Sequence, residues 1–402
     1  MDALAPREGA SACVPDQLIG RKHLKLLQRH LRRLNRCTAH PNRVLQYADL
    51  LTLLLMGFFN PVCRSLRSLD DFSQSPHLRE HLSLQRACRS TLSDANRALD
   101  GRLLEPLIED LKSRLPDLAG RDRKLQKLLR QITIVDGSFF SVAANVAWAL
   151  RRRKTWGEQD DRFVRLDLQY CCATGLPDSI EINGKGSGEV SAAKRHIQSG
   201  VIYVADRGIF SYDYVRQILQ NGSDLVLRIK KSIDFVSTRQ RPRSQQALAA
   251  GVLGDFEGHL EQMPDVKLRL VVIADESNPG HLIRLLCSLE QQPAEVIGQV
   301  YRLRWQIELF FRWLKVHAHF RHLISYSQNG LTLGFYVAVI AVLLMYLHSG
   351  RKVSKYAYNL LGLVAAGLAR AEDILPILQA REREREMDRR RLARKRLQKI
   401  SR

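Results

Sequence analysis

The sequence predicts a mixed α/β protein in which a sheet domain follows an all-helical N-terminal domain. Over residues 21–115 leucines recur at helical spacing, and no strand-like run interrupts them. From residue 131 onward, short β-branched segments alternate with helical ones in the order β-β-β-α-β-α-β, which is typical of a mixed sheet. Between about 231 and 292 this alternation breaks, and the strand-like run VKLRLVVIAD among polar loops indicates a partly β insertion.

These patterns divide the 402-residue chain, which is long enough for two or three domains. We expect a disordered N-terminus at 1–20, a helical domain at 21–130, a sheet domain at 131–350 with its insertion at about 231–292, and a C-terminal helix with a basic tail at 351–402.

The helical domain is predicted from three amphipathic or apolar segments. RKHLKLLQRHLRRLNRC places leucines on one face and basic residues on the others, and LQYADLLTLLLMGFF is typical of a buried helix. The third segment, STLSDANRALDGRLLEPLIEDLKSRL, has Ser93 as its expected N-cap.

In the sheet domain we expect strands in ITIVDGSFFSV, RFVRLDLQYCCATG, LPDSIEIN, VIYVADRG and SDLVLRIK. The first is expected to end at Asp136-Gly137 and the fourth at Asp206-Arg207-Gly208. The segments GEVSAAKRHI and SYDYVRQILQNG are expected to be helices.

The charge of the chain points to an anionic partner. A net charge of +22 favours nucleic acid or an anionic membrane surface. The N-terminus lacks the pattern of a signal peptide, and seven scattered cysteines favour reduced thiols in the cytoplasm. The apolar run from Leu331 to Leu347 has about the minimum length of a membrane span, but we favour the core helix of a soluble protein.

Four polar residues align on one predicted helix, YRLRWQIELFFRWLKVHAHF. Tyr301, Arg304, Glu308 and Lys315 fall on one stripe. The opposite, inward face carries Leu303, Ile307, Phe310 and Leu314. An i, i+4 pair such as Arg304–Glu308 is often only a surface ion pair. A carboxylate flanked by cations also suits a site where a metal ion and phosphates meet.

Two aspartates upstream favour the second interpretation. Asp136 and Asp206 each follow an apolar run, and the ends of such strands are where open α/β sheets place their sites. Asp-Gly is also a common turn dipeptide. Together with Glu308, however, the two aspartates form a carboxylate set of the kind that binds Mg²⁺ or Mn²⁺.

On these residues the chain resembles bacterial insertion-sequence transposases of the DDE type, in the family with a Tyr-Arg-Glu-Lys signature. That signature, Y-x2-R-x3-E-x6-K, is matched without a gap by YRLRWQIELFFRWLK. The runs VDGS and ADRGIFSYD resemble the two aspartate regions of the family, and a β-rich insertion precedes the glutamate. The resemblance covers about residues 45–350.

The resemblance implies a ribonuclease-H-like catalytic domain that cleaves transposon ends and transfers them into target DNA. Asp136, Asp206 and Glu308 would hold two Mg²⁺ ions, with Mn²⁺ as a substitute. Four residues would contact DNA: Tyr301, Arg304, Lys315 and Arg207. The partners would be double-stranded DNA (terminal inverted repeats and target DNA) and a second protomer, in the bacterial cytoplasm at the nucleoid and with no membrane. The helical domain would bind the transposon ends.

Some features depart from the family or leave alternatives open. Some members stack a flipped base on a tryptophan of the insertion, but none lies between residues 207 and 292 here. Either another aromatic such as Phe235 or Phe256 serves, or no hairpin is made this way. His317, His319 and His322 could hold zinc, although a basic DNA-facing stripe is favoured.

Two other functions compete with an active transposase. A transposase-derived repressor without catalysis would also be basic and bind DNA, but the three intact carboxylates favour the enzyme. A membrane-associated protein built around the apolar run would leave those carboxylates unexplained.

Overall fold

The computed structural model divides the chain into two compact units, one built from residues up to 115 and from 317 on, the other from residues 116–316. The residues described are 21–59, 65–79, 86–115, 128–129, 131–143, 146–152, 161–275, 278, 280–316, 324–349 and scattered positions between 360 and 391. The expected disorder at 1–20, the three clustered histidines and most of the basic tail lie outside this part of the chain.

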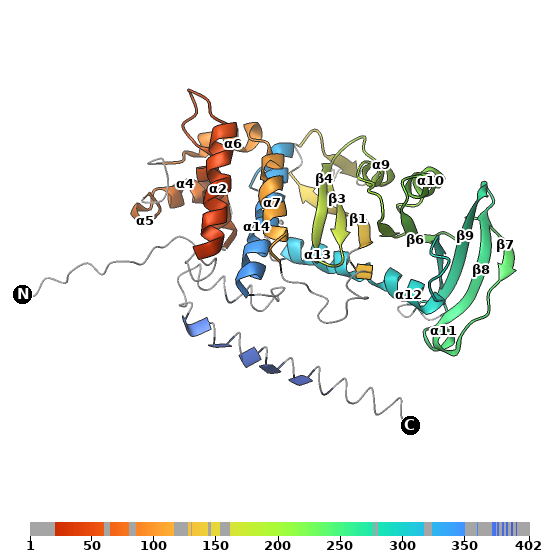
Figure 1. Ribbon diagram of the computed structural model, residues 1–402. Helices are drawn as coiled ribbons and strands as arrows, with labels where there is room; N and C mark the ends of the chain where they lie inside the picture. Colours follow the sequence, from red (N-terminus) through yellow and green to blue (C-terminus); the bar gives the residue numbers. More distant parts are fainter. Residues whose placement is uncertain are drawn as a thin grey trace, which may run out of the picture. The chain divides into compact units, whose positions relative to one another are not determined.

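The first unit is helical where it is described, as the sequence predicts (Figure 1). Its elements are α2 (Arg21–Cys37), α3 (Tyr47–Phe59), α4 (Leu66–Ser73), α5 (Pro76–Arg79), α6 (Arg89–Ala98), the 3₁₀ helix η1 (Gly101–Leu104), α7 (Glu105–Lys112) and α14 (Gln328–Ser349). The five leucines of α3 are all buried, so this helix forms the apolar interior that its composition predicts.

The N-cap predicted at Ser93 is wrong, because α6 begins four residues earlier at Arg89. The cap comes from another helix: Asp70 of α4 accepts a hydrogen bond from the Arg89 N–H at 3.1 Å. Its carboxylate also binds the Arg86 guanidinium, at 2.9 Å from Nε. A capping group supplied by a neighbouring helix cannot be read from local sequence.

The apolar helix α14 packs against α3, α6 and α7 of the same unit. The Tyr336 hydroxyl donates to Glu105 Oε1 at 2.8 Å, and Asn329 Nδ2 donates to the Arg97 carbonyl at 2.8 Å. Among the residues searched, Gln328–Leu347 is the one stretch long and apolar enough to cross a membrane, and 78% of its window is buried inside the structure. Such burial is what a core helix requires.

The second unit contains a ten-stranded mixed sheet. Its strands are β1 (Ile132–Val142), β2 (Leu150–Arg152), β3 (Asp161–Cys171), β4 (Leu176–Asn183), β5 (Ile202–Ala205), β6 (Asp224–Ile229), β7 (Phe235–Gln240), β8 (Val252–Leu260), β9 (Met263–Ala274) and β10 (Leu282–Cys287). The order across the sheet is β2-β3-β1-β5-β6-β10-β9-β8-β7, with β4 also paired to β3. β5 is parallel to both β1 and β6, whereas β3 is antiparallel to β1.

Five helices complete this unit: α9 (Glu189–Lys194), α10 (Tyr212–Gln220), α11 (Gln245–Ala249), α12 (Ala294–Arg302) and α13 (Trp305–Val316). α9 and α10 pack on one face of the sheet, over a core that includes Val135, Tyr203 and Leu227. The residues between these in the strands point the other way, toward α12 and α13. There the Phe310 ring of α13 lies 5.6 Å from the Tyr170 ring of β3.

The segment expected to be a partly β insertion contains four strands, and it is continuous with the main sheet. β10 pairs antiparallel with β6 and joins β7, β8 and β9 to the sheet, which extends as the long curved ribbon in Figure 1. A buried ion pair holds this part together: Arg269 Nε and Nη2 each lie 2.7 Å from an Asp255 carboxylate oxygen. Arg269 Nη1 also donates to the Leu289 carbonyl at 3.1 Å.

The strand predicted to end at Asp136-Gly137 instead continues to Val142. Antiparallel pairing with β3 runs through Val142, whereas parallel pairing with β5 stops at Val135. Asp136 therefore lies in the middle of β1. It is the first residue beyond Val135, the last residue of β1 that pairs with β5. Asp206 follows β5 at once, as predicted.

Candidate active site at the centre of the sheet

The two predicted aspartates lie side by side, Asp136 within β1 and Asp206 directly after β5. Val135, Ala205 and Leu227 form the last row that β1, β5 and β6 share. The next position on each strand is Asp136, Asp206 and Arg228. Residues in one row project from the same face of a sheet, so two carboxylates and a guanidinium face α12 and α13 together.

Arg228 is the site residue that the sequence interpretation missed. Its Nη1 atom lies 3.6 Å from Asp206 Oδ1. The available signal was position, because Arg228 follows an apolar run in SDLVLRIK in the way that Asp206 follows its own run. That signal can be recognised only when β6 is aligned with β5, so that Arg228 lies beside Asp206.

The signature residues come from two helices and not one, which corrects the prediction of a single helix. α12 ends at Arg302 and α13 begins at Trp305. The backbone at this junction makes i→i+3 hydrogen bonds, such as Arg304 N–H to the Tyr301 carbonyl at 3.0 Å. This tight turn is of the 3₁₀ type. It keeps Ile307, Phe310 and Leu314 buried, as predicted, whereas Leu303, expected on the same face, lies in the turn and is half-buried.

Arg304 lies between the first and third predicted carboxylates. Its Nη1 atom is 2.7 Å from Glu308 Oε1 and 3.5 Å from Asp136 Oδ2. The side chain of Arg304 is only 12% exposed. Its Nε atom is buried and has no hydrogen-bond partner in the described part of the chain, which leaves one charged N–H for an acceptor from outside.

Tyr301 contacts the second aspartate. Its hydroxyl donates to Asp206 Oδ1 at 3.2 Å, and its ring lies 5.8 Å from the Arg304 guanidinium carbon. Burial and the neighbouring Asp206 raise the pKa of Tyr301 above its ordinary value, so the phenol stays protonated and acts as a donor.

The carboxylates interact with one another. Burial raises the pKa of Asp136 to about 6, and the charges of Glu308 and Asp206 add to this rise, while the Gly137 N–H and Arg304 oppose it. The Gly137 N–H donates to Asp136 Oδ1 at 2.9 Å. A crowded, partly buried set of like charges favours any cation that can bind it.

The remaining predicted residues lie outside this cluster. Lys315 places its Nζ 5.1 Å from the centre of the Phe140 ring, and burial lowers its pKa. Phe140 is four residues beyond Asp136, about 13 Å along an extended strand. Arg207 is exposed in the turn after β5. The structure thus brings together Asp136, Asp206, Glu308, Tyr301 and Arg304, and it places Lys315 and Arg207 nearby.

No group of three His, Cys, Asp or Glu side chains within the described ranges is close enough to hold a metal ion as it stands. The Arg304 guanidinium contacts both Asp136 and Glu308, two of the three predicted ligands.

Residues 127–344, more than half of the chain, match the family model described as "Transposase DDE domain". The chain is a DDE transposase. The matched region begins just before β1 and includes the aspartate pair, the Arg304 turn and α13. The Tyr-Arg-Glu-Lys resemblance and the insertion-sequence class predicted from the sequence are thereby confirmed.

Three bacterial relatives of this transposase have similar sequences. The putative transposase y4zB of Sinorhizobium fredii is 26% identical over 57% of this chain and 64% of its own length. The probable transposase for insertion sequence element IS5377 of Geobacillus stearothermophilus is 27% identical over 65% of this chain and 68% of its own. The putative transposase for insertion sequence element IS4SA of Synechocystis is 24% identical over 64% and 70%. The matches therefore span about two thirds of these relatives.

Proposed function

We propose that this transposase performs cut-and-paste transposition with Asp136, Asp206 and Glu308 as its catalytic carboxylates. In the first step a water oxygen attacks the phosphorus at the transposon end, and the bond to the 3′ oxygen breaks to leave a 3′-OH. In the second step that 3′-OH attacks a target phosphodiester and releases a target 3′-OH. The observation that carries this proposal is the row of Asp136 and Asp206, with Arg304 joining Asp136 to Glu308.

The carboxylates fit a hard divalent cation. Three carboxylates supply the oxygen donors that Mg²⁺ and Mn²⁺ prefer, and burial, with smaller contributions from Glu308 and Asp206, raises the pKa of Asp136. We propose two Mg²⁺ ions, replaceable by Mn²⁺, held by Asp136, Asp206 and Glu308 after Arg304 turns toward DNA. The ions would lower the pKa of the attacking hydroxyl and neutralise the leaving oxygen.

The neighbouring cations would bind the DNA backbone. The Arg304 Nε has no hydrogen-bond partner among the described residues, and it lies on the same side of the guanidinium as Nη2, so these two nitrogens can donate to a phosphate in a two-point contact. Arg228 and Tyr301 both contact Asp206 and would orient it while facing the same phosphate. Lys315 would contact the backbone farther along the duplex, and exposed Arg207 would do so beside Asp206.

The remainder of the assignment follows from this core. We propose that the sheet is ribonuclease-H-like, supported by an antiparallel β1–β3–β4 set followed by parallel β5 and β6. The helical unit would bind the terminal inverted repeats, and two protomers would join two ends at the bacterial nucleoid. Phe235 and Phe256 are half-buried and pack against the core of the sheet, which favours a reaction in which neither ring stacks on a flipped base.

The test uses the purified full chain with Mg²⁺ and DNA that carries the inverted repeats flanking its gene. We expect Asp136→Asn, Asp206→Asn and Glu308→Gln each to abolish strand cleavage and to leave end binding intact. Asp265→Asn is the matched control, because this exposed carboxylate pairs only with Arg216 among the contacts described and should cleave normally. Full cleavage by any of the three would overturn the assignment. End binding without cleavage by the unmutated chain would favour the repressor.

A further inference from the structure

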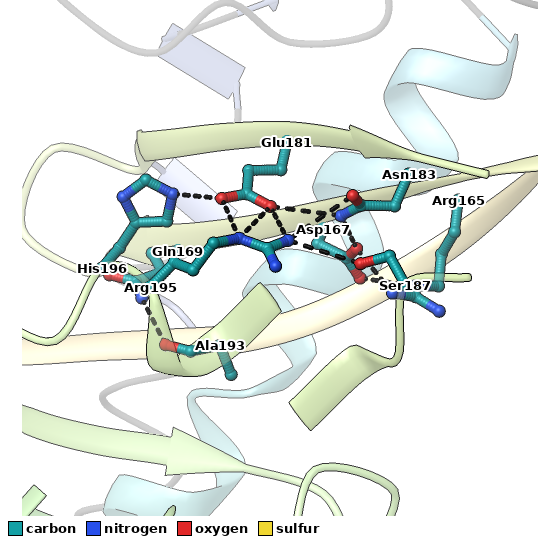
Figure 2. A network of polar contacts seen from close by, with 9 residues as sticks. All are labelled: Arg165, Asp167, Gln169, Glu181, Asn183, Ser187, Ala193, Arg195 and His196. Carbon is teal, nitrogen blue, oxygen red and sulfur yellow. Dashed lines mark hydrogen bonds and ion pairs between the residues drawn. The ribbon is translucent and has the colours of Figure 1, made fainter. Parts of the chain in front are cut away.

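A buried polar network lies on β3 and β4, next to the strand that carries Asp136 (Figure 2). Arg165 donates to both Asp167 oxygens, with Nε at 2.7 Å and Nη2 at 2.9 Å. These two side chains are 6% and 11% exposed. Asn183 Nδ2 adds a third donor to Asp167, at 2.6 Å. The Asp167 carboxylate is therefore fixed from two strands.

A second set of hydrogen bonds, centred on Glu181, supports the Arg165–Asp167 pair. Glu181 of β4 accepts from Arg195 and His196 at the end of α9, and Asn183 joins it to Asp167 (Figure 2). Although burial opposes ionisation, these hydrogen bonds hold the pKa of Glu181 well below its usual range. The network therefore couples β3, β4 and α9 through hydrogen bonds and ion pairs between their side chains.

The register of β1 and β3 places Asp167 directly behind the first catalytic aspartate. Asp167 pairs with Gly137, so the two residues point to the same face, opposite to Asp136. A Cβ atom at residue 137 would lie 2.7 Å from Asp167 Oδ1 and 3.3 Å from Arg165 Cδ. The Asp167 carboxylate thus occupies the space that a side chain of residue 137 would need.

We infer that Asp167, held by Arg165, is a positioning residue for the Asp136 carboxylate. The step between them is short: the Asp167 carboxylate fills the space beside Gly137 where a Cβ would lie, and the Gly137 N–H is hydrogen-bonded to Asp136 Oδ1 at 2.9 Å. A buried ion pair seldom stabilises a fold more than apolar packing of the same volume. Here the Arg165–Asp167 pair serves to hold the backbone at residue 137 in one position. This inference rests on the proposed function, because it assumes that Asp136 is a metal-binding carboxylate.

The first test compares two isosteric variants of buried, arginine-paired aspartates in the same unit. We expect Asp167→Asn to weaken Mn²⁺ binding and end cleavage by about 10- to 100-fold, as loss of an outer partner of a metal ligand does. Mn²⁺ binding is measured by electron paramagnetic resonance on the full chain, and thermal unfolding is measured in parallel.

Asp255→Asn is the control, because it also removes a carboxylate from a buried arginine pair, on β8. Arg269 would still hold the Leu289 and Gln292 carbonyls there. We expect it to lower the unfolding temperature about as much as Asp167→Asn while Mn²⁺ binding stays normal. Normal Mn²⁺ binding by Asp167→Asn, or an equal loss in both variants, would overturn the inference.

The second test uses the close contact itself. We expect Gly137→Ala to weaken Mn²⁺ binding because its methyl group displaces the Asp167 carboxylate. The loss of Mn²⁺ binding free energy in the double variant Gly137→Ala/Asp167→Asn should then be smaller than the sum of the losses in the two single variants, since both changes act through one contact. Losses that simply add would contradict the inference.

The two failures can be told apart. If Asp136→Asn binds Mn²⁺ and cleaves normally, the proposed function is wrong. If Asp136→Asn abolishes both while Asp167→Asn matches the unmutated chain, only the positioning role is wrong.

Discussion

The Arg304 guanidinium forms a largely buried ion pair with Glu308, at 2.7 Å between Nη1 and Oε1. The same nitrogen faces Asp136 at 3.5 Å. One cation therefore partly neutralises two carboxylates that are both proposed to bind metal. Binding of DNA would therefore favour binding of metal, because a phosphate that binds Arg304 would release Asp136 and Glu308 to bind the metal ions.

We expect Arg304→Gln to bind Mn²⁺ more tightly than the unmutated chain when DNA is absent. A hydrogen bond between charged groups contributes about 1.5–3 kcal/mol, so its loss should strengthen Mn²⁺ binding by roughly tenfold or more. Calorimetric titration measures the affinity, and end binding should weaken in the same variant. Equal or weaker Mn²⁺ binding would mean that Arg304 does not compete for the carboxylates.

The pKa of Asp136 predicts how pH affects stability. Burial raises this pKa from the ordinary 3.8 to about 6, so the native state holds the proton more tightly than the unfolded chain does. The stabilisation from the protonated carboxyl is fully present below pH 3.8 and is lost as pH rises through 6.

Asp136→Asn, which is neutral at every pH, should therefore be more stable than the unmutated chain at pH 8. The difference should be on the order of 2–3 kcal/mol in the free energy of unfolding, and near zero at pH 4. Urea unfolding in EDTA measures it. An equal difference in unfolding free energy at both pH values would contradict the raised pKa of Asp136.

Arg228→Gln should reduce end cleavage by on the order of 100-fold, the usual cost of removing one donor near a reacting phosphate. The reason is its place in the row with Asp136 and Asp206 and its contact with Asp206. Single-turnover cleavage measures the rate, and gel shift measures end binding. The control is Arg239→Gln, an exposed arginine on β7. Equal rates for both variants would remove Arg228 from the site.

Lys315→Ala should weaken DNA binding and make it less dependent on salt. Loss of one phosphate contact reduces the slope of log affinity against log salt by about 1. Lys315→Arg should retain the slope, because it keeps the charge over the Phe140 ring. An unchanged slope in Lys315→Ala would exclude that phosphate contact.

Gly101→Ala should destabilise the helical unit by about 1–3 kcal/mol, the usual cost of overpacking. Its Cβ would lie 2.9 Å from the Leu333 backbone nitrogen of α14, which cannot turn away as a side chain can. Thermal unfolding followed by circular dichroism measures the change. Gly298→Ala is the control, since a Cβ there meets only Ile273 at 3.8 Å. Equal unfolding temperatures for both variants would argue against the close packing of α14.

Sequence patterns were informative where a residue's environment is set by its own segment. The runs before Asp206 and over β3 and β4 predicted those strands almost to the residue. The helical periodicity of 301–315 did not identify Tyr301 and Phe311 as buried. It correctly identified Ile307, Phe310 and Leu314, because a 3₁₀ turn between two helices hardly changes that pattern. For the same reason it concealed the break at Leu303 and Arg304.

The parts that could not be predicted depend on partners distant in sequence. β1 passes through Asp136 because β3 pairs with it beyond that point, and α6 begins at Arg89 because Asp70 caps it. Arg228 becomes a site residue only when β6 is placed beside β5. No local pattern contains these pairings.

The place of β10 between β6 and β9 limits how this chain can change in length. A deletion that joined Ile229 directly to Ala294 would remove β10 and leave β6, which carries Arg228, without its hydrogen-bonding partner. An unpaired strand edge of this kind promotes aggregation. Loss of β9 would leave β10 without its partner on that side in the same way. Within residues 230–293 we therefore expect shortening to be tolerated in the turns that join β7, β8 and β9, and truncated forms that stay soluble to retain Leu282–Cys287 paired with β9.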